Sequence, residues 1–400
     1  MRQRIEWTLN TLPKSDDTRL PIMAPENVEA ARTFHQSFPQ YDPTPLVALD
    51  AMAKRLGLAG VCVKDESFRF GLNAFKALGV SFAMGSYIAK QTGRAIAECD
   101  YNYLTGNQLV RDFGQATFVT ATDGNHGRGV AWTARQLGQK AVVHMPLGAT
   151  QARFDNIAEE GAQVTVEQLN YDDCVRLAAR EAESIERAVL LQDTAWDGYE
   201  EIPTWIMQGY GTLSSEAVEQ LANLGIGKPT HVFVQAGVGS LASSVVGYLA
   251  NVFGGDAPRT VIVEAAAANC LFQSALAGDG QPRAVTGDLK TIMAGLSCGE
   301  PSTLGWDILR NHATVFLSCP DWVAENGMRL LARPLDGDQR VVSGESGAVG
   351  MGALAAIMLD PTYAELKTAL ELDGNSSVLL ISTEGDTDPE QYRRIVETGS

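Results

Sequence analysis

The chain has 400 residues and is 45% hydrophobic, enough for one large α/β enzyme or for two or three domains with a sizeable core. Its formal net charge of −17 argues against nucleic acid or an anionic membrane as a partner, since binding to phosphates depends on clustered Lys and Arg. Six cysteines without a C-x-x-C pair, and an N-terminus without the apolar core of a signal peptide, indicate a cytoplasmic protein with mostly free thiols. The five histidines are isolated in the sequence, so no metal site is predicted.

The first quarter of the chain leads to a lysine. The elements predicted before it are a short helix over 26–37, an extended proline-containing stretch over 41–46, a helix over 49–57 and a strand over 61–64. Apolar residues from Phe75 to Phe82 then recur at helical spacing. This spacing predicts a helix with Asn73 as its N-cap and Lys76 in its first turn.

Regular alternation of strands and helices begins after a polar stretch (92–114) that is predicted to be an irregular surface insertion. One series has β-rich runs at 116–120, 140–144, 163–166 and 188–191, with helices near 127–137, 150–160 and 171–186. A second series has a helix over 203–223 and strands over 230–235, 260–264, 314–318 and 377–382. The pattern predicts an α/β fold with two open, twisted, mostly parallel sheets flanked by helices. We expect a large domain formed by 1–90 and 195–400, a small domain formed by 91–194, and a cleft between them.

One uncharged stretch, Val232 to Gly254, is long enough to span a bilayer. It contains several glycine, serine and amide residues, and it divides naturally into a strand, a glycine loop and a helix. We therefore interpret it as part of an α/β core.

Two candidate parts of a site lie where a strand gives way to a helix. The first part is the start of the helix that contains Lys76. The positive end of the helix dipole there disfavours another cation, which favours the neutral, nucleophilic amine of Lys76 that imine chemistry needs. In the second, T-D-G-N-H-G-R-G (122–129), the N–H groups of Gly124, Asn125 and His126 could receive a carboxylate or a phosphate. A solvated lysine and a tight left-handed turn are the ordinary structural alternatives.

Two further candidate parts follow later in the chain. A-G-V-G-S-L-A (236–242) again joins a strand to a helix, and its glycines let consecutive backbone amides close on an anion. The same motif matches a dinucleotide fingerprint, with Glu264 where a ribose-binding acid falls. The strand before S-T-E-G-D (382–386) ends in hydroxyls and acids, where Ser382 could face a heteroaromatic nitrogen or simply leave the sheet.

Over residues 41–390 the order of these four parts resembles the fold-type II pyridoxal-phosphate enzymes, which include the serine and threonine dehydratases, tryptophan synthase β and cysteine synthase. The resemblance implies pyridoxal 5′-phosphate in the interdomain cleft. It implies that Lys76 carries the cofactor, that Asn125 bonds the pyridoxal 3′-oxygen, and that Ser382 faces the pyridine nitrogen. Thr383 would take that place if the strand register is off by one. The phosphate would be held by Gly237, Val238, Gly239, Ser240 and Leu241.

Longer stretches resemble the diaminopropionate ammonia-lyases within that family; they are 65–67 with 71–76, 122–129, 192–196, 203–210, 294–301 and 344–350. The dehydratases carry Ser at the positions of Asp123 and Ala74. A substrate with a second ammonium needs an anionic partner, which Asp123 and Asp193 would supply. The resemblance thus implies a homodimeric carbon–nitrogen lyase that eliminates D- and L-2,3-diaminopropionate to pyruvate and two ammonia. Catalysis is expected from Lys76, Asp123 and Asp193, and contacts to this amino-acid substrate from Thr122, Asp123, Gly124, Asn125, His126 and Asp193.

Three alternatives remain open at this point. A dinucleotide-dependent dehydrogenase built on Gly237 to Gly239 and Glu264 would leave Lys76 unexplained, and a non-catalytic binding protein could keep the same fold. Within the family, an L-serine or L-threonine dehydratase is the rival. A disulfide between Cys270 and Cys298, each just after a strand, is a further hypothesis, although a reducing cytoplasm disfavours it.

Overall fold

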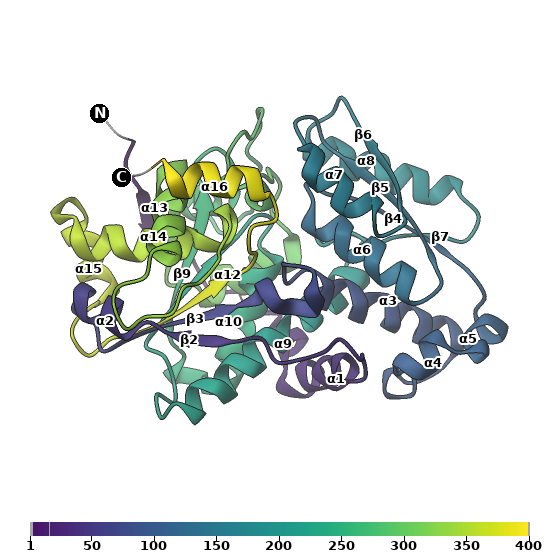
Figure 1. Ribbon diagram of the computed structural model, residues 1–400, viewed down its shortest axis with the longest axis horizontal. Helices are drawn as coiled ribbons and strands as arrows, with labels where there is room; N and C mark the ends of the chain where they lie inside the picture. Colours follow the sequence, from purple (N-terminus) through teal and green to yellow (C-terminus); the bar gives the residue numbers. More distant parts are fainter. Residues whose placement is uncertain (1–2, 16, 399–400) are drawn as a thin grey trace.

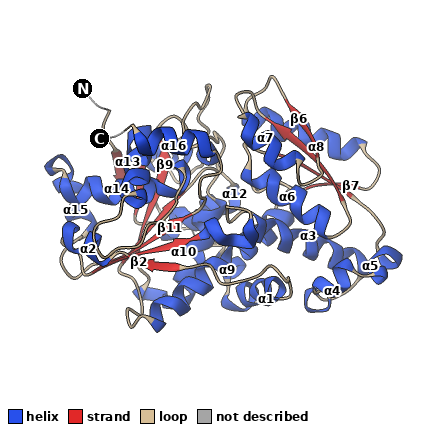
Figure 2. Cartoon of the chain, viewed as in Figure 1, coloured by secondary structure: helices blue, strands red, loops and turns tan. Residues whose placement is uncertain are grey.

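The protein, in a computed structural model that describes residues 3–15 and 17–398, contains two separate β-sheets with helices packed on their faces (Figure 1, Figure 2). One sheet has seven strands and the other has four. The predicted α/β fold with two mostly parallel sheets flanked by helices is confirmed.

The seven-stranded sheet has the strand order β1-β10-β9-β8-β11-β3-β2. Its strands are β1 (Glu6–Leu9), β2 (Leu46–Ala48), β3 (Gly60–Asp65), β8 (His231–Gln235), β9 (Arg259–Ala265), β10 (Val315–Cys319) and β11 (Ser377–Ser382). The five inner strands are parallel and almost fully buried, as their apolar, β-branched sequences require when helices cover both faces of a sheet. The two short edge strands run antiparallel to their neighbours.

The four-stranded sheet is entirely parallel and has the order β6-β5-β4-β7. Its strands are β4 (Thr117–Ala121), β5 (Lys140–Met145), β6 (Gln163–Val166) and β7 (Ala188–Leu190). They lie on the right of Figure 1, away from the strands of the larger sheet. The carboxyl end of β4 leads directly into the T-D-G-N-H motif.

The helices are α1 (Pro25–Gln36), α2 (Asp50–Leu56), α3 (Ala77–Thr92), α4 (Tyr101–Thr105), α5 (Asn107–Asp112), α6 (Asn125–Gln136), α7 (Gln151–Ala158), α8 (Tyr171–Ser184), α9 (Glu201–Asn223), α10 (Ser240–Phe253), α11 (Cys270–Ala277), α12 (Thr303–His312), α13 (Asp321–Ala332), α14 (Glu345–Leu359), α15 (Ala364–Leu370) and α16 (Pro389–Glu397). Helix α3 packs against both α9 and α6, and so links the two sheets. A Cβ at Gly79 would lie 2.5 Å from the ring of Tyr210, so glycine is needed for this close approach of α3 to α9.

Some sequence predictions were wrong in detail. The stretch 92–114 is not irregular, since it contains a short 3₁₀ turn (Ile96–Glu98) followed by α4 and α5. The uncharged stretch 232–254 divides into β8, a glycine turn and α10, as expected. No helix within residues 3–15 and 17–398 combines the length and the apolar character needed to cross a membrane.

Candidate active site

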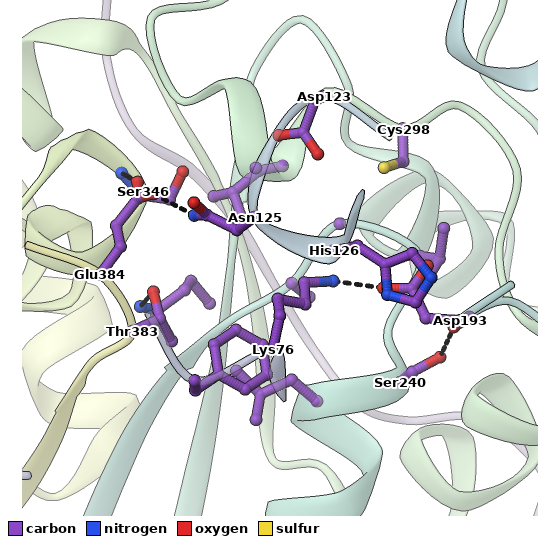
Figure 3. A pocket seen from close by; sticks show the side chains of 18 of the residues that line it. Lys76, Asp123, Asn125, His126, Asp193, Ser240, Cys298, Ser346, Thr383 and Glu384 are labelled. Carbon is purple, nitrogen blue, oxygen red and sulfur yellow. Dashed lines mark hydrogen bonds and ion pairs between the residues drawn. The ribbon is translucent and has the colours of Figure 1, made fainter. Parts of the chain in front are cut away.

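The loop that carries Lys76 connects β3 to α3 and has an unusual backbone. Phe70, Gly71 and Asn73 all have positive φ, at 51°, 72° and 60°. Asn73 is therefore not the predicted N-cap; its side-chain amide donates instead to Asp386 Oδ1 at 3.1 Å. The N-cap position is occupied by Lys76 itself, one residue before the helix begins. These three left-handed residues turn the backbone just before Lys76. The side chain of Lys76 then points into a pocket (Figure 3).

Lys76 forms an ion pair with Asp193, which follows β7 of the small sheet (Figure 3). The rings of Phe75 and Tyr210 lie 5.4 and 5.9 Å from the lysine nitrogen. Burial alone would lower the pKa of Lys76, but the carboxylate of Asp193 outweighs burial and raises the pKa above its ordinary value. The ion pair with Asp193 thus favours the ammonium form of Lys76 in this arrangement, and the neutral amine that imine chemistry needs stays a prediction.

His126 lies beside the same carboxylate, with its Nδ1 3.7 Å from Asp193 Oδ2. Its Nε2 is 2.9 Å from the backbone carbonyl of Leu191, which can only accept, so Nε2 carries the proton. Burial lowers the pKa of His126. A neutral imidazole with this tautomer directs the free acceptor Nδ1 towards the pocket.

Asp123 enters the pocket from the turn after β4 (Figure 3). Burial raises its pKa to about 6, although Arg153 Nη1, 3.6 Å from Oδ2, acts in the opposite direction. Gly124 leaves room for the aliphatic part of the Arg153 side chain, since a Cβ at position 124 would lie 3.3 Å from Arg153 Cδ. A carboxyl whose pKa is near neutrality is suited to general-base work.

Thr122 and Gly124 do not line the pocket, in contrast to the substrate contacts predicted for them. The hydroxyl of Thr122 accepts hydrogen bonds at 2.9 Å from the N–H groups of Gly124 and Gly127. Because these donors are already used, Thr122 shapes the turn. Asp123, Asn125 and His126 are the members of the motif that face the cavity.

The glycine loop after β8 lines the opposite wall of the pocket with Gly237, Val238, Gly239, Ser240 and Leu241. Its first-turn N–H groups have no partner within α10, and Gly239 has a φ of 101°. A Cβ at Gly237 would lie only 3.2 Å from the Cys298 sulfur, which explains the glycine. The Ser240 hydroxyl donates to the backbone carbonyl of Asp193. A helix N-terminus with a concave glycine approach is a ready phosphate site.

At the end of β11 the structure selects Thr383 over Ser382. The two side chains point to opposite faces of the strand, and only Thr383 lines the pocket. The hydroxyl of Ser382 donates to Ser343 Oγ at 2.8 Å, behind the pocket. Thr383 Oγ1 accepts from Gln235 Nε2 at 2.7 Å, which leaves its own proton for another acceptor. Of the two residues predicted for this position, the structure brings the alternative, Thr383, to the pocket.

Glu264 does not hold a ribose-binding position at the pocket, and Cys270 and Cys298 are not joined by a disulfide. Glu264 is fully buried and accepts hydrogen bonds from the N–H groups of Leu271 and Phe272, at 2.8 and 2.6 Å. Burial raises its pKa to about 8. It therefore caps the start of α11 and does not contact the pocket. Cys270 and Cys298 are both free thiols.

Several polar atoms in the pocket lack hydrogen-bond partners among the described residues; they are Asp123 Oδ2, His126 Nδ1, Gln235 Oε1 and Ser346 Oγ. Buried polar groups are normally paired, so an unsatisfied group around one cavity indicates a polar ligand. Together with the lysine and the glycine cradle, they fit pyridoxal phosphate. A cavity of about 530 Å³ adjoins the pocket and shares Asp123 and Tyr171 with it.

Sequence reasoning missed Glu384, Ser346, Tyr171 and Cys298, which all line the pocket. Ser346 lies in the stretch 344–350 and Glu384 in S-T-E-G-D (382–386). A linear pattern does not show which residues of such a motif face the pocket. Arg153 carried no motif signal at all.

Comparisons with known proteins agree with this geometry. A family model for pyridoxal-phosphate-dependent enzymes matches residues 38–384. The diaminopropionate ammonia-lyase of Salmonella typhimurium is 49% identical over 402 residues, covering 100% of this chain and 99% of the relative. That of Escherichia coli K12 is 50% identical over 95% of this chain and 93% of its own length.

Solved structures give the same result. The holo diaminopropionate ammonia-lyase of Escherichia coli superposes with a TM-score of 0.91 at 46% identity, covering 99% of this chain and 97% of that one. A threonine deaminase from Solanum lycopersicum shares the fold, with a TM-score of 0.72 at 18% identity and coverage of 99% and 98%. The chain therefore belongs to the pyridoxal-phosphate-dependent enzymes and, within them, to the diaminopropionate ammonia-lyase family of carbon–nitrogen lyases.

Proposed function

We propose that this enzyme eliminates both enantiomers of 2,3-diaminopropionate, with one water consumed and pyruvate and two ammonia released. The observation that carries the proposal is the placement of two carboxylates, the buried Asp193 and the partly buried Asp123, in one pocket with Lys76. A substrate with two ammonium groups and one carboxylate matches a pocket that offers two carboxylates and backbone N–H donors. The relatives from Salmonella typhimurium and Escherichia coli are diaminopropionate ammonia-lyases, which supports the same substrate for this enzyme.

The residues that would hold pyridoxal phosphate come from four segments. Lys76 would bind its carbonyl carbon and the loop 237–241 its phosphate, while Asn125 would face the 3′-oxygen. We assign the pyridine nitrogen to Thr383, because its hydroxyl lines the pocket and has a free proton. When bound, the cofactor withdraws electrons from the substrate Cα and so acidifies its proton.

The chain's own groups then move that proton. The amine of Lys76 can take it from one face of the substrate and the carboxylate of Asp123 from the other, since they enter the pocket from different segments, the loop before α3 and the turn after β4 (Figure 3). Asp193 holds the lysine as an ion pair and offers a carboxylate to the second ammonium. His126 Nδ1 can accept a proton next to both groups.

The L-serine or L-threonine dehydratase alternative has less support. A substrate with a neutral β-hydroxyl has no second ammonium group to place against the carboxylates of Asp123 and Asp193. The dehydratase-like structures share the fold at low identity.

We further propose that the enzyme is a cytoplasmic homodimer in which residues 91–194 form the small domain and 1–90 with 195–400 the large one. The four parallel strands within 117–190 support that division, and the family resemblance supports the dimer. Light scattering of the purified protein measures the mass, and a value near twice 42.9 kDa is expected.

A substrate comparison tests the central proposal. Purified enzyme with pyridoxal phosphate is assayed for keto-acid release from D- and L-2,3-diaminopropionate, L-serine and L-threonine. We expect much larger kcat/KM values for the two diamino acids, with two ammonia per pyruvate. Faster release from serine or threonine would assign the enzyme to the dehydratases instead.

A further inference from the structure

Glu384 is a buried acid that the proposed chemistry does not use. It comes two residues after the end of β11, is 1% exposed, and lines the pocket next to Thr383. Dehydration of a carboxylate is unfavourable, so each of its contacts must offset that penalty. Its contacts come from three separate segments of the chain.

The backbone around Glu384 fastens the lysine loop. Glu384 forms an isolated antiparallel bridge with Ala74, two residues before Lys76. The N–H of Phe75 donates to Thr383 at 3.2 Å, and the N–H of Gly385 donates to the Asn73 carbonyl at 3.0 Å. The position of the lysine is thus tied to the end of β11.

The side chain of Glu384 reaches two other segments. Its Oε1 accepts from the N–H of Ser346, in the first turn of α14, at 3.1 Å. A carboxylate at this place is also favoured by the helix dipole. Its Oε2 accepts from Asn125 Nδ2 at 2.5 Å, and the hydroxyl of Thr387 lies 3.3 Å away (Figure 3). Asn125 belongs to the small-sheet side of the pocket, so Glu384 joins the two sides.

This contact decides which way the amide of Asn125 turns. A carboxylate can only accept hydrogen bonds, so it selects the orientation in which Nδ2 faces Glu384. The nitrogen carries a second proton, which remains for an acceptor in the pocket. With a neutral or absent partner at 384, the amide could rotate and present its oxygen instead, which would repel an anionic or electron-rich ring oxygen.

We propose that Glu384 is a positioning residue that holds Asn125 with its free N–H directed at the cofactor's ring oxygen. The inference rests on the proposed function, because it takes Asn125 as the partner of that oxygen. Glu384 itself moves no proton in the reaction. Its effect on the cofactor passes through Asn125.

A double-mutant cycle tests the proposal. Glu384→Ala, Asn125→Ala and the double variant are compared with wild type by equilibrium dialysis of the holoenzyme and by the visible spectrum of the bound cofactor. Loss of one charged hydrogen bond predicts a roughly tenfold to hundredfold weaker cofactor affinity and a shifted absorption maximum for either single variant. The double variant is expected to resemble Asn125→Ala alone, since one residue acts through the other.

Asp386→Ala is the matched control. Asp386 lies on the same loop and holds the lysine loop through Asn73, but it does not contact Asn125. Its effect on cofactor affinity should add to that of Asn125→Ala, and the spectrum should keep its wild-type maximum. Glu384→Gln retains the shape but is neutral and can present either its oxygen or its NH2 group to Asn125, so it is expected to weaken cofactor affinity and to shift the absorption maximum in the same direction as Glu384→Ala.

Additive losses from Glu384→Ala and Asn125→Ala would overturn the proposal. If Glu384→Ala does not fold, the cycle is run with Glu384→Gln, and additivity decides in the same way. Both readouts are taken without substrate. A wild-type enzyme that binds the cofactor but does not eliminate diaminopropionate would refute the proposed function and leave this cycle decisive for Glu384.

Discussion

The molecule contains two buried clusters of charge that differ in one respect. Beneath the lysine loop, Lys64, Glu66, Arg69 and Glu216 have fully buried side chains and form a closed network, with ion pairs of 2.6 to 2.8 Å. Thr44 adds a hydroxyl to Glu66 at 2.6 Å. In the active-site pocket, by contrast, buried carboxylate, imidazole and hydroxyl atoms lack hydrogen-bond partners among the described residues.

The difference separates a structural role from a catalytic one. A complete network has one arrangement and resists change, because removal of any member leaves an unpaired buried charge. An incomplete cluster keeps donors and acceptors for a ligand, and it can hold a single group such as Asp123 with a pKa nearer neutrality. Burial alone would not distinguish the two, since both clusters are buried.

The largest effect is expected at Lys76. Lys76→Ala should abolish turnover and remove the visible absorption of the lysine-bound cofactor, because no other amine lines the pocket within the described residues. Lys90→Ala, on the same helix but 55% exposed and paired with Glu201, is the control and should retain activity. Normal turnover by Lys76→Ala would show that the pocket has been assigned wrongly.

Asp123→Asn removes a charge from the incomplete cluster without changing its size. If Asp123 is the base for the D-enantiomer and Lys76 for the L-enantiomer, turnover of the D-substrate should fall by roughly 10²–10⁴-fold and that of the L-substrate far less. Stopped-flow or steady-state assays with each enantiomer measure the ratio. Equal losses would instead make Asp123 a binding partner for the second ammonium.

Glu216→Ala breaks the closed network, because Lys64 loses its ion pair and Arg69 keeps Glu66 alone of its two carboxylate partners. The free energy of unfolding, measured in urea at neutral pH, should fall by about 3–5 kcal/mol. Burial alone would raise the pKa of Glu216, but Arg69 and Lys64 lower it to about 2. Because the folded pKa is depressed, the wild-type advantage should persist above the ordinary pKa of 4.5 and disappear as the pH falls towards 2.

A smaller effect is expected when Arg153 is replaced. Its charge lowers the pKa of Asp123 against the effect of burial, so Arg153→Met should raise that pKa above about 6. The acidic limb of the pH profile of kcat/KM for the D-substrate should then move to higher pH. Arg176→Met is the control, since Arg176 is paired with Glu300 on the surface. An unchanged limb would mean that another group sets it.

The sequence was sufficient for the framework and for most of the pocket. Uninterrupted apolar runs such as Val232 to Val234 predicted the inner parallel strands, because both faces of those strands are buried. Gly237 and Gly239, which follow the end of β8, predicted the phosphate loop. Strands β1 and β2 were missed, because they have four and three residues and no fully buried position.

The errors in the site all depend on contacts between distant segments. Whether Ser382 or Thr383 faces the cavity depends on the register of β11, which a hydroxyl pair in sequence leaves open. Asn73 has the composition of an N-cap, but its amide is captured by Asp386 from the other end of the chain. The bond between Asn125 and Glu384 joins residues 259 positions apart, beyond any local pattern.

The antiparallel strand β1 has a consequence for how the protein reaches its folded state. It pairs with β10, more than 300 residues later in the chain, and covers the outer edge of the larger sheet. At a synthesis rate of about 5–20 residues per second, the N-terminal strand emerges roughly 15–60 s before its partner. An open sheet edge can recruit strands from other molecules. The nascent chain is therefore most exposed to pairing with strands of other molecules before β10 has been synthesised, that is, until residue 319 leaves the ribosome.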